Sequence, residues 1–163
     1  MNIHDEINWP PELQPEEWPG SVIEDMHPRV FTDAAIPLRL ESGIPMWPSQ
    51  LPRAHVRQER GGSQHHTNNG ERLSTATDMH CRTYTQMMQL FGFAQRIDTI
   101  GGIGVYFHTK TPMVHIDIRE ARLLWVCTAD KKYVYLTENS TISEFIRFYE
   151  TLARELAKVK QNG

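Results

Sequence analysis

The stretch of sequence that most constrains this fold is residues 113–118, where apolar and polar side chains alternate from Val114 to Ile118. Successive side chains of a β-strand point to opposite faces, so Val114, Ile116 and Ile118 would share one face. His115 and Asp117 would then share the other face. We therefore predict a half-buried strand that presents an imidazole and a carboxylate from a rigid support.

Two further residues complete a candidate metal site with this strand. His65 offers a second imidazole and Asp78 a carboxylate. Two imidazoles and one carboxylate, with a water molecule in the fourth position, are a typical ligand set for catalytic zinc. We predict that His65, Asp78 and His115 bind Zn²⁺, and that Asp117 orients a ligand from outside the coordination sphere.

Four short motifs of the sequence resemble the signatures of one family of zinc peptidases. They are Ser63-x-His65 followed by Gly70, then Ala76-x-Asp78, then Gly101-Gly102-Ile103-Gly104-Val105-Tyr106, then Val114-His115-x-Asp117. They are similar to the SxHxxGxAxD, GGIGYY and VHxD motifs of zinc D-Ala-D-Ala carboxypeptidases and related phage or bacterial peptidoglycan peptidases. The resemblance runs from about His27 to about Trp125.

The resemblance implies a fold, a cofactor and an activity. The expected fold is the α+β hedgehog/DD-peptidase fold, with a small antiparallel sheet and flanking helices. The expected activity is zinc-dependent hydrolysis of peptidoglycan stem peptides, by a D-Ala-D-Ala carboxypeptidase or an endolysin-type endopeptidase of phage origin. The sequence leaves both types open.

Two of the ligand assignments have alternatives. Residues 67–74, rich in Asn, Gly and charge, form an inserted loop between the first histidine and the aspartate, so His66 competes with His65. Asp78 could instead cap the helix that we expect after it, because aspartate is a favoured N-cap residue.

The catalytic groups are assigned from the register of the family. Arg53 is expected to bind the substrate's terminal carboxylate, because a guanidinium can hold a carboxylate with two hydrogen bonds. The position three residues before the last ligand, where related enzymes carry a carboxylate base, is Pro112. In some carboxypeptidases of the family a histidine slightly upstream of the last ligand serves instead, so the resemblance implies His108 as the first candidate for the general base, and His80 is the second.

Composition narrows the class of protein and of partner. A chain of 163 residues that is 39% hydrophobic and 23% charged is typical of a globular protein with one main core. A net charge of -3 gives no electrostatic reason to expect nucleic acid binding. Cys81 and Cys127 form no CxxC pair, which argues against thiolate ligation of zinc.

The sequence also predicts where the protein acts. No stretch is long and apolar enough for a membrane span, and residues 1–6 lack the features of a signal peptide. We expect synthesis in a cytoplasm, followed by action on the cell wall after release or as part of a virion, with stem peptides and virion proteins as partners. The rival hypotheses are a virion structural protein that has lost turnover and a wall-binding module that does not cut.

Local patterns predict the elements. Prolines at 10, 11, 15 and 19 indicate an extended N-terminal arm over residues 1–25, which leaves residues 26–163 as the peptidase-like domain. Helices are expected over 27–40 with a break at Pro37, after Asp78 as far as Gly92, and from Thr141, where Glu144 completes a capping box. The last helix is expected to seal the sheet with one apolar face, formed by Ile142, Phe145, Ile146, Tyr149, Leu152, Leu156 and Val159. Strands are expected at 44–47, 105–107, 113–118, 123–127 and 133–136.

Overall fold

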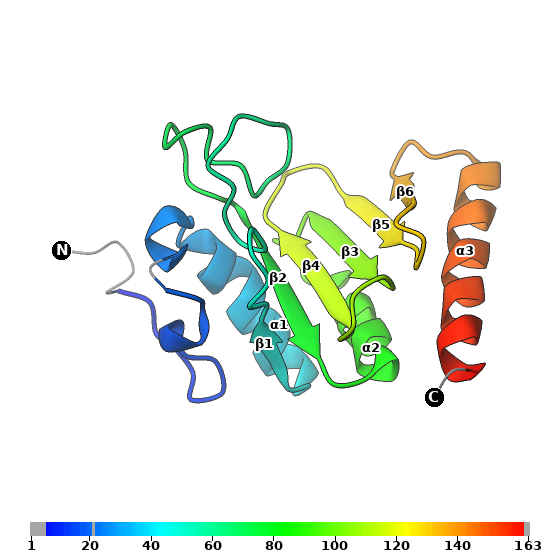
Figure 1. Cartoon of the computed structure of the whole chain (residues 1–163), viewed down its shortest axis with the longest axis horizontal. Helices are drawn as coiled ribbons and strands as arrows, with labels where there is room; N and C mark the ends of the chain where they lie inside the picture. The colour runs from blue at the N-terminus through cyan, green and yellow to red at the C-terminus, as the bar shows by residue number, and fades with distance from the viewer. Residues whose placement is uncertain (1–5, 21, 162–163) are drawn as a thin grey trace.

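A computed structural model describes residues 6–20 and 22–161, and within them the chain forms an α+β fold around one open sheet (Figure 1). The strand order is β1-β2-β4-β3-β5-β6. The strands are β1 (Met46–Pro48), β2 (Ala76–Cys81), β3 (Gly102–Tyr106), β4 (Met113–Asp117), β5 (Leu123–Cys127) and β6 (Tyr133–Thr137). The α-helices are α1 (Ile36–Ser42), α2 (Tyr84–Ala94) and α3 (Ile142–Gln161), and shorter helical turns lie at η1 (Pro15–Glu17), η2 (Val22–Asp25) and η3 (Phe31–Ala35).

The sheet is mixed, so the prediction of a purely antiparallel sheet is wrong at one strand pair. β3 and β5 run parallel, whereas the other neighbouring strands of the described sheet run antiparallel. β3 and β4 form an antiparallel hairpin, and the chain then crosses to the other edge of β3 instead of adding a strand beside β4. A connection of this kind makes β5 parallel to β3.

The first helix follows its sequence signals closely. The break expected at Pro37 takes the form of the π-helical turn η3, which leads directly into α1. Proline has no N–H, so the Asp33 carbonyl lacks its helical partner, and the Thr99 hydroxyl donates to that carbonyl instead. Gly43 ends α1 with a φ of 63°, a backbone conformation that favours glycine.

One alternative and one prediction around the second helix are wrong. Asp78 does not cap it: Asp78 lies within β2, and the Thr83 side chain accepts the Gln86 N–H at 3.1 Å. The helix also continues through Gly92 and ends at Ala94. An exposed glycine lowers helix propensity but does not end a helix whose apolar face, here Met87, Leu90 and Phe91, is buried.

The N-terminal segment packs against the main core through aromatic side chains. The rings of Trp9 and Trp18 lie 5.0 and 5.2 Å from the ring of Phe31, and the Trp18 indole N–H donates to the Thr77 hydroxyl at 3.3 Å. Leu13 of this segment is fully buried. Residues 1–5 lie outside the described residues. They belong to the predicted N-terminal arm and to the segment in which we expect no signal peptide.

The two faces of the sheet differ in what covers them. Ile103, Val105, Val114 and Ile116 belong to the hydrophobic core, and α1 and α2 lie behind the sheet in Figure 1. His115 and Asp117 alternate with these core residues and so point to the opposite face, as the sequence predicts. Within residues 6–20 and 22–161, no helix is both long enough and apolar enough to cross a bilayer.

The last helix seals the sheet with only part of its predicted apolar face. The capping box forms, since Glu144 accepts the Thr141 N–H at 2.7 Å and the Thr141 hydroxyl accepts the Glu144 N–H at 3.3 Å. Phe148 and Leu152 are buried. Thr151 and Glu155 are buried on the same face, which is offset around the helix axis from the predicted stripe. The side chains of Ile142, Phe145, Ile146 and Tyr149 are therefore exposed.

Candidate metal centre

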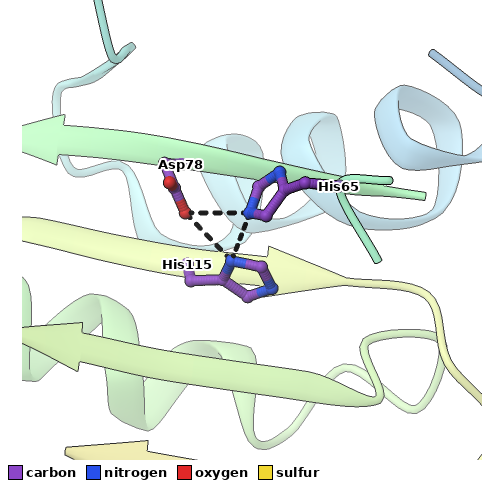
Figure 2. Close-up of side chains that lie close together, drawn as sticks. All are labelled: His65, Asp78 and His115. Atoms are coloured by element: carbon purple, nitrogen blue, oxygen red, sulfur yellow. Dashed lines mark hydrogen bonds and ion pairs between the residues drawn. The ribbon is translucent and has the colours of Figure 1, made fainter. Parts of the chain in front are cut away.

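Three buried side chains from distant parts of the chain converge on one point (Figure 2). His65 Nε2 lies 3.0 Å from His115 Nδ1, which lies 2.9 Å from Asp78 Oδ1, and the distance from His65 Nε2 to Asp78 Oδ1 is 3.6 Å. Asp78 on β2 is directly opposite His115 on β4, so the ladder between these strands sets their separation. His65 enters from the connection between β1 and β2.

Each imidazole is oriented by a partner on its other nitrogen. His65 Nδ1 lies 3.1 Å from the His55 carbonyl oxygen, and His115 Nε2 lies 3.0 Å from Asp117 Oδ2. A carbonyl and a carboxylate accept hydrogen bonds, so both of these nitrogens donate. The nitrogens that face Asp78 are then free to bind a metal, and carboxylate–histidine pairing of this kind is typical of metal sites.

The charges around the three residues favour a cation. Burial alone would raise the pKa of the Asp78 carboxyl, but the neighbouring imidazoles of His65 and His115 outweigh it and hold that pKa far below its usual range. Burial alone would lower the pKa of His115, but hydrogen bonds to Asp117 and Asp78 outweigh burial and raise it. Both shifts favour a positive charge beside the Asp78 carboxylate, and a metal ion could supply that charge.

The ligand set fits a divalent metal in chemistry and in spacing. Ligand atoms about 2.0–2.1 Å from a tetrahedral zinc are about 3.3 Å from one another. The three separations here, 2.9, 3.0 and 3.6 Å, lie on both sides of that value. The donors could therefore hold a metal with little movement, and the set of two nitrogens and one oxygen does not by itself identify which metal.

A cleft of about 280 Å³ adjoins this centre and gives a ligand access to it. His65 and His115 form part of its wall. The rest includes two arginines and four aromatic residues, which are Arg57, Arg119, Tyr106, Trp125, Tyr133 and Tyr135. Among the described residues that line the cleft there is no aspartate or glutamate, so the wall is basic and aromatic.

Two glycines of β3 make room for the side chains around His115. A Cβ at Gly104 would lie 2.1 Å from Cε2 of the Trp125 indole, and one at Gly102 would lie 2.2 Å from Asp117 Oδ2. Neither glycine has a positive φ, so close approach rather than backbone freedom explains them. Trp125 uses this space to pack on His115, with ring centroids 4.6 Å apart.

The structure distinguishes the two neighbouring histidines. His66 points away from the cluster: its ring packs on Gly61, and its Nε2 lies 3.8 Å from Glu59 Oε1. The Arg53 guanidinium also pairs with Glu59 and is exposed. Arg53 is thus not brought to the cleft, where Arg57 and Arg119 stand instead.

Neither candidate for the general base lines the cleft. His108 Nδ1 lies 3.2 Å from the Cys127 thiol sulfur, and its ring packs edge-on against Tyr106. His80 is buried between the Ser49 hydroxyl, 3.0 Å from its Nε2, and the Pro112 carbonyl, 3.2 Å from its Nδ1. The catalytic roles of His108 and Arg53 remain predictions.

Sequence reasoning missed several residues that shape the centre. Arg119 donates to both carboxylate oxygens of Asp117, and the His55 carbonyl orients His65. Arg119 could have been found, because it continues the alternation of His115 and Asp117 by two positions. Trp125 and His55 carry no local signal, since their roles depend on contacts between distant segments.

Comparisons with known proteins add no relative. A scan against models of protein families, a search of curated proteins and a search of solved structures each gave no match. Fold and geometry therefore carry the interpretation: this is an α+β protein whose buried His65–Asp78–His115 cluster could bind a metal.

Proposed function

We propose that this protein is a zinc-dependent peptidase that hydrolyses peptidoglycan stem peptides. The observation that carries the proposal is the convergence of His65, Asp78 and His115 at the wall of an open cleft. Structural zinc sites are usually closed by four protein ligands, whereas catalytic sites keep one position for water or substrate. Three protein ligands beside a cleft fit the catalytic type.

The residues around the centre would have different roles in such an enzyme. Zinc bound there would polarise a peptide carbonyl and lower the pKa of a water molecule. Asp117, fixed by Arg119, holds His115 in the orientation that leaves Nδ1 free. Arg57 lies in the cleft with no carboxylate partner among the described residues, so we assign it the binding of substrate carboxylates in place of Arg53.

The stem peptide as substrate rests on the resemblance to the hedgehog/DD-peptidase family. The cleft is consistent with it, since a basic wall suits a peptide with free carboxylates and aromatic side chains suit its methyl groups. The proposed place of action is the cell wall, reached after release from the cytoplasm or as part of a virion. Carboxypeptidase and endopeptidase activity both remain compatible with this cleft.

The test combines metal analysis with hydrolysis. Wild-type protein supplied with zinc should hold one equivalent, His115→Ala and Asp78→Ala should hold almost none, and His66→Ala should match the wild type. Zinc-loaded wild type should release free amines or D-alanine from purified peptidoglycan. A wild-type protein that stays free of metal in excess zinc would contradict the proposal.

One observation favours a second candidate function. Metallopeptidases generally position a carboxylate or imidazole as general base, and no carboxylate lines this cleft among the described residues. A non-catalytic protein of a virion, or a wall-binding module, would keep the fold and the metal without needing that base. Such a protein would be retained on cell-wall sacculi while releasing neither amines nor D-alanine.

A further inference from the structure

Tyr106 stands on the same face of the sheet as the metal ligands. It is the last residue of β3 and is paired with Met113, two positions from His115 on β4. Gly104, the residue directly opposite His115, leaves room for the Trp125 indole, which packs on His115 and donates to the Tyr106 hydroxyl. Tyr106 is therefore a diagonal neighbour of His115, a distance that a tyrosine side chain can bridge. Both residues line the cleft.

The Tyr106 hydroxyl is held in place as an acceptor and keeps its own proton available. The Trp125 indole N–H donates to it at 3.2 Å, and no described residue accepts the hydrogen of the Tyr106 hydroxyl. Its ring is confined by edge-on contacts with His108 and Tyr133, at centroid distances of 5.7 and 6.4 Å. An O–H group that already accepts one hydrogen bond is a stronger donor for the next.

The ionisation of Tyr106 suits a donor and not a base. Burial raises the pKa of its phenol well above the usual value, and the negative charge of Asp78 raises it further. The hydroxyl therefore stays protonated at neutral pH.

We propose that Tyr106 is a catalytic residue that donates a hydrogen bond to the carbonyl oxygen of the scissile peptide as that oxygen becomes negative. The inference rests on the proposed peptidase function. Attack by water forms a new C–O bond while the carbonyl π electrons move to oxygen, and Tyr106 stabilises this oxyanion without giving up its proton. The C–N bond then breaks, and the proton lost by the attacking water ends on the leaving amine nitrogen.

The two arginines and the serine of the cleft are less suited to this role. The Arg119 guanidinium is engaged by Asp117, and Arg57 Nε donates to the Arg53 carbonyl at 3.3 Å. Ser63 lies on the connection between β1 and β2, where its hydroxyl accepts the His65 N–H. Tyr106 alone among these combines a strand position with a confined ring, and preorganised donors stabilise an oxyanion best.

The experiment compares zinc-loaded Tyr106→Phe with wild type and with Tyr84→Phe. Tyr84 is a matched control, because its ring stacks on Phe107 and it does not line this cleft. We expect equal zinc content in all three proteins. In Tyr106→Phe, kcat should fall about 100- to 1,000-fold with little change in KM.

Binding gives a readout that needs no turnover. The probe is the phosphinate analogue of D-alanyl-D-alanine, whose anionic tetrahedral centre mimics the oxyanion, measured by calorimetry. We expect Tyr106→Phe to bind it about 10- to 100-fold more weakly than the wild type, and Tyr84→Phe to bind it equally. Equal binding and equal kcat in Tyr106→Phe would overturn the role of Tyr106 and leave the peptidase proposal standing. A zinc-loaded wild type that neither binds the probe nor hydrolyses peptidoglycan would overturn both.

Discussion

At the scale of single residues, the space beside the metal centre depends on Gly104. Its missing side chain lets the Trp125 indole lie against His115 and reach the Tyr106 hydroxyl. A strand glycine of this kind marks close approach of another group. Gly104 therefore affects both the packing of Trp125 and the position of His115 in the candidate metal centre.

Gly104→Ala should destabilise the protein by about 2 kcal/mol and weaken metal binding, because the new methyl group would overlap the Trp125 ring. Gly92→Ala is the matched control: a Cβ there meets nothing within 4 Å, and an exposed helical alanine should stabilise by about 0.5–1 kcal/mol. Thermal denaturation and metal analysis of both variants check this. Equal stability of Gly104→Ala and wild type would show that Trp125 can move without cost.

Asp117 orients His115 and should therefore control metal affinity without binding the metal itself. Asp117→Asn removes the charge that holds the His115 Nε2–H, and zinc affinity should fall about 10- to 100-fold. Asp98→Asn, at an exposed position, is the control. Competition with a chromogenic chelator measures both variants, and unchanged affinity in Asp117→Asn would contradict the orienting role.

His55 should make stability depend on pH. Burial lowers its pKa from 6.5 to about 4, while its Nε2–H donates to the Ser49 carbonyl and its Nδ1 accepts the Thr77 hydroxyl. Between these pH values the unfolded chain binds a proton that the folded protein does not. The free energy of unfolding should thus fall by up to roughly 3 kcal/mol as pH drops from 6.5 to 4.

His55→Gln, which keeps a donor for Ser49, should flatten this dependence. Urea denaturation at a series of pH values, on metal-free wild type and variant, measures the difference between their slopes. Identical slopes would mean that other groups account for the acid sensitivity.

At the scale of elements, α3 shows how an amphipathic pattern can overstate burial. The predicted apolar stripe includes Phe145, Ile146 and Tyr149, which are exposed. The buried face, on the helix that contacts β5 and β6, is offset from this stripe around the helix axis and contains Phe148, Thr151, Leu152 and Glu155. Phe145 is 51% exposed and Phe148 is 0% exposed, although they are three residues apart. Helix periodicity indicates an apolar stripe, and packing against the sheet decides which face is buried.

Phe148→Ala should therefore destabilise the fold by about 3–5 kcal/mol, whereas Phe145→Ala should change stability by less than about 1 kcal/mol. The first leaves a cavity against Phe91, and the second removes a side chain that already faces solvent. Chemical denaturation of the two variants gives the comparison. A large loss in Phe145→Ala would show that the exposed half of α3 is covered in solution.

At the scale of the whole molecule, the metal centre joins segments that are distant in the chain. β2, β4 and the connection between β1 and β2 each supply one residue of the cluster that could bind a metal. A ligand that binds the folded state and not the unfolded chain stabilises it by mass action. Metal binding and global stability should therefore be coupled.

Zinc at 100 times its dissociation constant should stabilise the protein by about 2.7 kcal/mol and raise the unfolding midpoint by roughly 5–10 °C. Asp78→Ala should show no such shift, whereas His66→Ala should behave as the wild type. Scanning calorimetry with zinc or with a chelator tests this. A wild-type midpoint that does not respond to zinc would argue that the cluster binds no metal.

Local pattern was sufficient to predict most elements. The strands predicted at 113–118, 123–127 and 133–136 form within one residue of these bounds. These strands, the Gly43 helix end and the Thr141–Glu144 capping box each depend on residues close in sequence. The strand around Asp78 and the parallel pairing of β3 with β5 were not predicted. Both depend on the order in which the strands pair in the sheet. The alternation of apolar and polar residues within one segment gives no information about that order.

The sequence by itself determined that His115 and Asp117 share one face, because strand geometry places alternate residues together. Only the tertiary structure decided that His65 and not His66 meets Asp78. That choice follows from backbone hydrogen bonds between distant segments, Arg57 N to His65 O at 2.8 Å and Thr75 N to Gln64 O at 2.9 Å, which fix the direction of the loop. His65 lies in a turn closed by the hydrogen bond from His66 N to Ser63 O at 3.1 Å, and within this fixed backbone one imidazole meets the cluster while the other faces Glu59.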